Sequence, residues 1–115
     1  MSFCYMQLHT TNHSASNDFY SKFLGWNLDK SNPNYTEAST DGVIDAGVMP
    51  QQRPGAPSSW LPYVAVDNMD KALKKAQDLG ATILQPATDV PGKGRYAVIA
   101  DPGGAAIGLW LVAAP

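Results

Sequence analysis

The sequence has few side chains that could hold a metal ion or form a disulfide. Its 115 residues include a single glutamate, Glu37, two histidines and one cysteine, Cys4. Because protein sites for divalent ions draw mainly on histidine, carboxylate and thiolate groups, such a site has few candidates here. A lone cysteine excludes a disulfide within the chain and suits the reducing cytoplasm, which is the localisation that the sequence predicts.

Long apolar runs and excess positive charge are also missing. No apolar run approaches the roughly 20 residues that a helix needs to span a bilayer. The first five residues lack the basic and apolar regions of a signal peptide. The formal net charge is −2 and no basic patch is present, so we expect neither nucleic acid nor a membrane as a partner. The hydrophobic fraction of 44% is enough for the core of one domain.

Two parts of the chain repeat the same order of predicted elements. Each part has a strand, a helix and then three strands. The predicted strands cover 3–11, 26–30, 35–40 and 43–49 in the first part, and 60–66, 81–84, 95–100 and 105–112 in the second, with a loop over 85–94. Asn12 and Gly25 bound the first helix, as Asp67 or Asn68 and Gly80 bound the second. The equal spacing of these caps indicates an internal duplication.

Apolar side chains recur at helical spacing in both predicted helices, which predicts that each packs an apolar face against its sheet. These side chains are Ala15, Phe19, Phe23 and Leu24 in the first helix and Met69, Ala72, Leu73, Ala76 and Leu79 in the second. Tyr20 and Trp26 are predicted to anchor the first helix to the sheet.

Residues 50–59 contain three prolines and a glycine and show no apolar periodicity. Each flank is only about half the length of an ordinary domain. We therefore interpret the segment as a connector within a single domain of residues 1–115. Its first module covers about 1–50 and its second about 60–115. Neither module could bury its sheet face alone.

Residues 8–12 with 18–26, 63–72 and 94–110 carry a resemblance to a known family. They include a Phe-Tyr pair and a Leu-Gly-Trp step in the first stretch, and an Asp-Pro-x-Gly turn in the last. In this order and spacing, they make the chain resemble the vicinal oxygen chelate superfamily, also called the glyoxalase, bleomycin-resistance and dioxygenase superfamily. The resemblance implies an α+β fold in which two βαβββ modules form paired half-barrels around a cleft.

Metal-dependent members of that family bind a divalent ion with side chains from the first and last strands of each module. The resemblance places the first-strand positions on Tyr5 and on Leu61, or on Trp60 if the gap is placed differently. The last-strand positions fall on Gly108 and within 43–47, where Asp45 is the candidate. At most one plausible ligand survives, so the sequence predicts no metal and no cofactor.

Tyr5, Gln7 and His9 alternate along the first strand and share one face, which suits hydrogen bonding to a small molecule in the cleft. The alternative is a solvent-facing edge of that strand. His9 could act as a general base, although a histidine in this setting is more often a hydrogen-bonded wall residue. Cys4 lies on the opposite, apolar face and is predicted to be buried and inert.

Residues of the second module extend the predicted ligand-binding set. Trp60 and Tyr63 could stack on a planar ligand, as could Tyr96 and Trp110, and the alternative is packing in the core or at a dimer interface. Arg95, with Lys93, could hold an anionic group, and the alternative is an exposed loop charge.

The residues and the resemblance together favour a metal-free protein that binds or sequesters a small molecule, as bleomycin-resistance-type members do. One alternative is a lyase, isomerase or dioxygenase-related enzyme of the same superfamily with a non-standard site. Another is a structural or regulatory interaction module. A homodimer is expected, because the family often pairs modules across chains and the chain has surplus aromatic and apolar strand residues.

Overall fold

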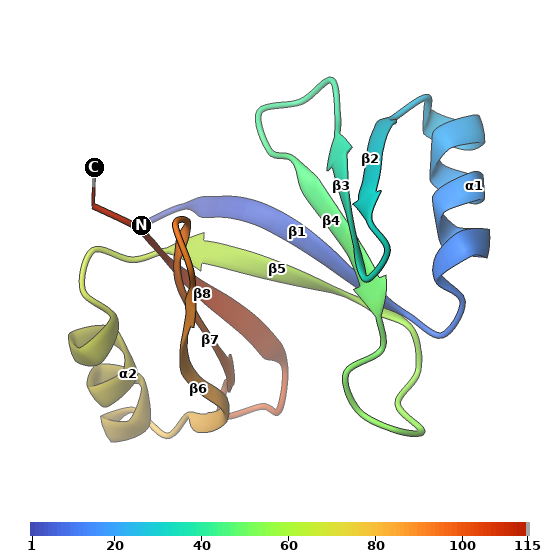
Figure 1. The fold of residues 1–115 in the computed structure, drawn as a ribbon. Coiled ribbons are helices and arrows are strands. Elements are labelled where there is room, and N and C mark those ends of the chain that lie inside the picture. Colours follow the sequence, from blue (N-terminus) through green and yellow to red (C-terminus); the bar gives the residue numbers. More distant parts are fainter. Residues whose placement is uncertain (115) are drawn as a thin grey trace. The chain divides into compact units, whose positions relative to one another are not determined.

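A computed structural model describes residues 1–114 and divides them into two compact units (Figure 1). The N-terminal unit comprises Tyr5–Leu61. The C-terminal unit joins Met1–Cys4 to the chain from Pro62 onward. The first few residues therefore belong to the unit that is built mostly from the second half of the chain.

The N-terminal unit is a four-stranded sheet with one helix. Strand β1 is parallel to β4, and the pairs β2–β3 and β3–β4 are antiparallel, which gives the order β2-β3-β4-β1. The elements are β1 (Phe3–Thr10), α1 (His13–Leu24), β2 (Asn27–Asn32), β3 (Tyr35–Ser39) and β4 (Ala46–Pro50).

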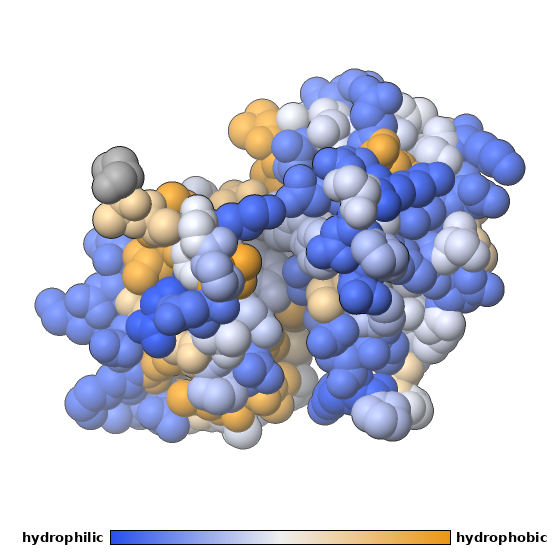
Figure 2. All heavy atoms as spheres, in the orientation of Figure 1, coloured by the Kyte–Doolittle hydropathy of each residue, from blue (hydrophilic) through white to orange (hydrophobic). Residues whose placement is uncertain are grey.

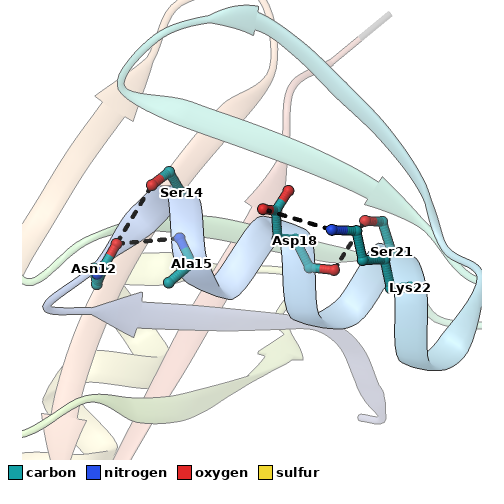
Figure 3. Close-up of polar contacts among 6 residues, drawn as sticks. All are labelled: Asn12, Ser14, Ala15, Asp18, Ser21 and Lys22. Carbon is teal, nitrogen blue, oxygen red and sulfur yellow. Dashed lines mark hydrogen bonds and ion pairs between the residues drawn. The ribbon is translucent and has the colours of Figure 1, made fainter.

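Both predicted caps of α1 are confirmed. The Asn12 side chain accepts a hydrogen bond from the backbone N–H of Ala15 at 3.1 Å, and so satisfies a donor that the first turn leaves unpaired (Figure 3). Gly25 ends the helix with φ of 72°, a conformation that costs glycine little.

The C-terminal unit repeats this plan, which confirms the βαβββ duplication. Strand β5 is parallel to β8, the pairs β7–β8 and β6–β7 are antiparallel, and the order is β5-β8-β7-β6. The elements are β5 (Ser59–Ala65), α2 (Met69–Asp78), β6 (Thr82–Val90), β7 (Gly94–Ala100) and β8 (Ala106–Val112). The α2 cap is Asn68, whose side chain accepts from Lys71 N. Neither this helix nor any other in the described residues is long and apolar enough to cross a membrane.

The predicted loop over 85–94 is wrong for most of its length, because β6 continues to Val90. Its register against β7 shifts between Ile83 and Gln85 and again between Gln85 and Thr88. Pro86 falls in the second irregularity, where no ladder pairing requires the N–H that proline lacks. A proline that favours a loop in the sequence is thus accommodated by a bulged strand.

The apolar core beside α2 follows the predicted pattern. Met69 is only 2% exposed and packs in a buried cluster with Val66, Ala97, Ile99 and Leu109. Leu79 is the exception, with 70% of its surface exposed at the end of the helix.

The predicted apolar face of α1 is wrong. Phe19, Phe23 and Leu24 are all exposed, whereas Asn17 is buried. Asn17 Nδ2 donates to Thr36 Oγ1 at 2.9 Å, and a polar contact thereby replaces the expected apolar one. Hydrogen bonds of this kind make a buried polar face tolerable, and the partner on β3 could not be known from helical spacing alone.

Candidate functional site

The sheet of the N-terminal unit carries a row of polar side chains on the face opposite α1. Thr10 lies on the helix side, since its hydroxyl is 2.8 Å from that of Ser16 on α1. Alternation along β1 then places Tyr5, Gln7 and His9 on the other face, as predicted.

These three side chains and Tyr35 form a connected polar row. Gln7 Nε2 donates to Tyr35 Oη at 3.1 Å, so the Gln7 Oε1 atom accepts from His9 Nε2 at 2.7 Å. The hydroxyls of Tyr35 and Tyr5 are 2.5 Å apart. This network assigns the proton of neutral His9 to Nε2 and leaves Nδ1 as the acceptor.

Tyr35 and Gly47 complete the row, although neither was predicted from the sequence as a site residue. Gly47 pairs with Gln7 across the β1–β4 ladder, and a side chain there would overlap the hydroxyls of Tyr35 and Tyr5. Tyr35 faces the row because β3 pairs with β4, a long-range contact. Alternation within 35–39 limits each residue to one of two faces, and only the register selects the face.

The C-terminal unit repeats this arrangement with different chemistry. Tyr63 pairs with Gly108 across the β5–β8 ladder, as Gln7 does with Gly47. A side chain at Gly108 would overlap the ring of Tyr63. In both modules a glycine on the last strand therefore leaves space for a tyrosine.

The residues at the family's metal-binding positions do not fit a divalent ion. Burial, the hydrogen bond to Tyr35 and nearby negative charge raise the pKa of Tyr5 well above its usual value, so Tyr5 remains a neutral phenol. Leu61 and Gly108 offer no donor. Among residues 1–114, no group of three or more His, Cys, Asp or Glu residues lies close enough to hold a metal.

Asp45, the candidate ligand of the first module, has a structural role instead. Its carboxylate accepts a hydrogen bond from the Thr40 backbone N–H at 3.1 Å, which orders the connection between β3 and β4. The β1–β4 register places Gly47, and not Asp45, opposite Gln7.

The other predicted ligand-binding residues lie elsewhere in their own units. Trp60 Nε1 donates to Tyr20 Oη at 3.3 Å, on the α1 side of the N-terminal unit. Arg95 is 2.8 Å from the Asp89 carboxylate, and alternation along β7 places it on the α2 side. Tyr63 shares the opposite face of that sheet with Trp110.

Cys4 is half-buried, with Sγ 3.6 Å from the Tyr63 carbonyl oxygen. Burial raises the pKa of its thiol, which disfavours the reactive thiolate.

Acid should destabilise the fold in part through His9. Burial lowers the pKa of His9 below its ordinary value of about 6.5. The unfolded chain then binds the proton at higher pH than the folded chain. His9 therefore contributes its full stability above about pH 6.5 and loses it as the pH falls toward the lower folded value. We expect the unfolding free energy of His9→Gln to fall less between pH 7.5 and 5.5 than that of the parent, measured by urea unfolding. Equal losses in the two proteins would contradict this.

Comparisons with known proteins agree with this fold. The profile described as "Glyoxalase/Bleomycin resistance protein/Dioxygenase superfamily" matches residues 4–109. The protein named "Putative glyoxylase CFP32" from Mycobacterium tuberculosis is 37% identical over an alignment of 116 residues. The alignment covers 92% of this chain and 44% of that protein. "Anthracycline biosynthesis protein DnrV" from Streptomyces peucetius is 36% identical over 115 residues, covering 84% of this chain and 42% of that protein. This chain thus spans less than half the length of these relatives.

A solved structure supports the fold alone. Homoprotocatechuate 2,3-dioxygenase from Brevibacterium fuscum superposes with a TM-score of 0.73 at 19% identity, covering 97% of this chain and 36% of that one. The match confirms the predicted α+β, glyoxalase-like fold class.

Proposed function

We propose that this chain, which belongs to the glyoxalase/bleomycin resistance protein/dioxygenase superfamily, binds a small planar molecule bearing oxygen substituents, without a metal ion. The polar row of His9, Gln7, Tyr35 and Tyr5 carries the proposal. It is partly buried and fixed by its own hydrogen bonds, and it presents an acceptor at His9 Nδ1 beside the hydroxyl groups of Tyr35 and Tyr5. A few fixed polar groups of this kind orient a ligand in most small-molecule sites.

The metal-free part of the proposal depends on the residues at the family's ligand positions. Glycine at Gly108 and leucine at Leu61 provide no donor atoms, and a phenol whose pKa is raised does not readily become a phenolate ligand. The ligand is therefore held by hydrogen bonds and ring contacts with the protein.

The chemistry of the row and the name of one relative both favour this class of ligand. Neutral hydroxyl and imidazole groups match hydroxyl and carbonyl oxygens better than they match strongly charged groups. The relative DnrV is named for anthracycline biosynthesis, and anthracyclines are planar aromatic compounds with such oxygens.

The second candidate is a lyase or isomerase that uses the same row, and the name of the relative CFP32 as a glyoxylase favours it. His9 Nδ1 would accept a proton from a carbon next to a carbonyl group. A tyrosine hydroxyl would donate to the oxygen on which negative charge develops.

Calorimetric titration with a soluble anthracycline tests the first proposal. The protein is purified without chelators, and its metal content is measured by elemental analysis. We expect binding that a chelator leaves unchanged, with metal far below one ion per chain. Tyr35→Phe removes the hydroxyl that joins Gln7 to Tyr5 and should weaken binding by about fivefold, since one hydrogen bond contributes about 1 kcal/mol.

Tyr20→Phe is the matched control. It removes a hydroxyl from the α1 side of the same unit, where that group accepts from Trp60. We expect its affinity to equal that of the parent. An equal loss in both variants would place the ligand elsewhere, and stoichiometric metal in the purified protein would refute the metal-free proposal. Chromatography of the recovered probe separates the candidates. Unchanged probe supports binding, and conversion that is lost in His9→Gln supports the enzyme.

A further inference from the structure

A hollow of about 370 Å³ lies between the start of α1, the end of β1 and the start of β5, wholly within the N-terminal unit. Leu8 and Thr10 line it from β1, so it lies on the α1 side of the sheet, whereas the polar row lies on the opposite face. Its volume falls within the usual range for small-molecule sites, about 300 to 1,000 Å³. The hollow is therefore separate from the polar row and large enough for a ligand of its own.

One wall of the hollow is aromatic and held in place. Tyr20 and Trp60 line it, and Trp60 Nε1 donates to Tyr20 Oη at 3.3 Å. Trp26 stacks on the Tyr20 ring, with centroids 5.3 Å apart and planes inclined by 15°. The hydrogen bond turns the Nε1 edge of Trp60 toward Tyr20 and leaves its ring faces for other contacts. The surface of this unit seen in Figure 2 is mainly hydrophilic, and a fixed aromatic wall differs from most of it.

Hydroxyl groups lie beside the aromatic wall and can donate to a ligand. Thr10 Oγ1 accepts from the Asn12 backbone N–H at 3.1 Å and lies 2.8 Å from Ser16 Oγ. One proton of this hydroxyl pair lies between the two oxygens, and no acceptor for the other is found among the described residues. The Tyr20 hydroxyl accepts from Trp60, and in the same part of the chain nothing accepts its own proton. At least two O–H donors are thus available at different points of the hollow.

The ligand that suits these walls is neutral. No charged side chain lines the hollow, whose lining residues all belong to the described part of the chain. A charged group would lose hydration there without an opposite charge to pair with. Ser58 and Ser59 add two further hydroxyls, so a matching ligand carries oxygen atoms at several points of its rim.

We propose that the hollow binds a neutral pyranose sugar. A pyranose carries oxygens around its rim, which can pair with the hydroxyls, and its C–H face packs on an aromatic ring face. A planar aromatic compound with one or two oxygens would leave some of the buried donors unpaired, which costs affinity. This inference does not depend on the proposed function, because the two sites lie on opposite faces of the sheet.

NMR titration of the full chain, labelled with nitrogen-15, tests the proposal. The probes are the methyl glycosides of glucose, galactose and mannose, with phenol as the planar comparison. The chain has three tryptophans, and Trp60→Phe identifies the indole N–H signal of Trp60. We expect at least one sugar to shift that signal with a dissociation constant of about 1 mM, ordinary for a ligand of this size, and to leave the Trp110 signal in place.

Ser16→Ala tests the hydroxyl side of the hollow. It removes one member of the Thr10 pair and should weaken sugar binding about fivefold, the loss for one hydrogen bond. Because alanine favours helices, the variant should fold like the parent. Ser14→Ala is the matched control and should bind like the parent. Figure 3 shows Ser14 on the edge of α1 away from Ala15, which lines the hollow.

Two tyrosine variants separate this site from the polar row. Tyr20→Phe should weaken sugar binding about fivefold and Tyr35→Phe should not, the reverse of the result expected for the ligand of the row. The proposal is overturned if no sugar shifts the Trp60 signal, or if phenol binds there more tightly than every sugar. Equal losses in Ser16→Ala and Ser14→Ala would also overturn it, whatever the titration of the polar row shows.

Discussion

Gly108→Ala should lower the free energy of unfolding by about 3 kcal/mol, the upper part of the range for overpacking a core. The added methyl group would overlap ring carbons of Tyr63, which is itself only 4% exposed. A buried ring cannot move aside without displacing its neighbours. The backbone at Gly108 has no positive φ, so the cost comes from the overlap alone. Urea unfolding followed by circular dichroism measures it.

Two further variants isolate the cause. Gly42→Ala is the control, because its nearest contact would be an ordinary 3.5 Å from the Thr40 hydroxyl. We expect a change within about 0.5 kcal/mol, as for other surface substitutions. Tyr63→Leu removes the obstructing ring, so the double variant Gly108→Ala/Tyr63→Leu should lose less stability than the two single losses added together. Simple additivity would show that the ring is not the obstacle.

The duplication and most elements could be predicted because their signals are local. Asn12, Asn68 and Gly25 act within one turn of their helices, and the alternation along β1 is a property of neighbouring residues. The resulting prediction that Tyr5, Gln7 and His9 share a face is consistent with their hydrogen-bonded row.

The features that sequence missed depend on pairing over long distances. The role of Gly47 follows from its register opposite Gln7, and that of Tyr35 from the hydroxyl of Tyr5, 30 residues away. The orientation of α1 was mispredicted for the same reason. Helical spacing identifies two possible faces, and the hydrogen bond from Asn17 to Thr36 selects the polar one. The contact of Trp60 with Tyr20 could not be predicted from the sequence, because Tyr20 lies on a helix 40 residues earlier.

Met69→Ala should cost about 3 kcal/mol of unfolding free energy, within the usual range for truncating a buried methionine. Met69 is 2% exposed at the start of α2 and packs against Leu109 and Ile99 of the sheet. Removing its side chain leaves a cavity that the strands cannot close, because their backbones are fixed by the β7–β8 ladder.

Leu79→Ala is the matched truncation for Met69→Ala, since Leu79 lies just after the same helix but is 70% exposed. We expect it to cost less than about 0.5 kcal/mol. The contrast separates burial from helix propensity, because leucine, methionine and alanine all favour helices. Equal losses in the two variants would mean that α2 is held by its own propensity rather than by its buried face. The apolar spacing of α2 would then be no better evidence of packing against the sheet than the apolar spacing of α1.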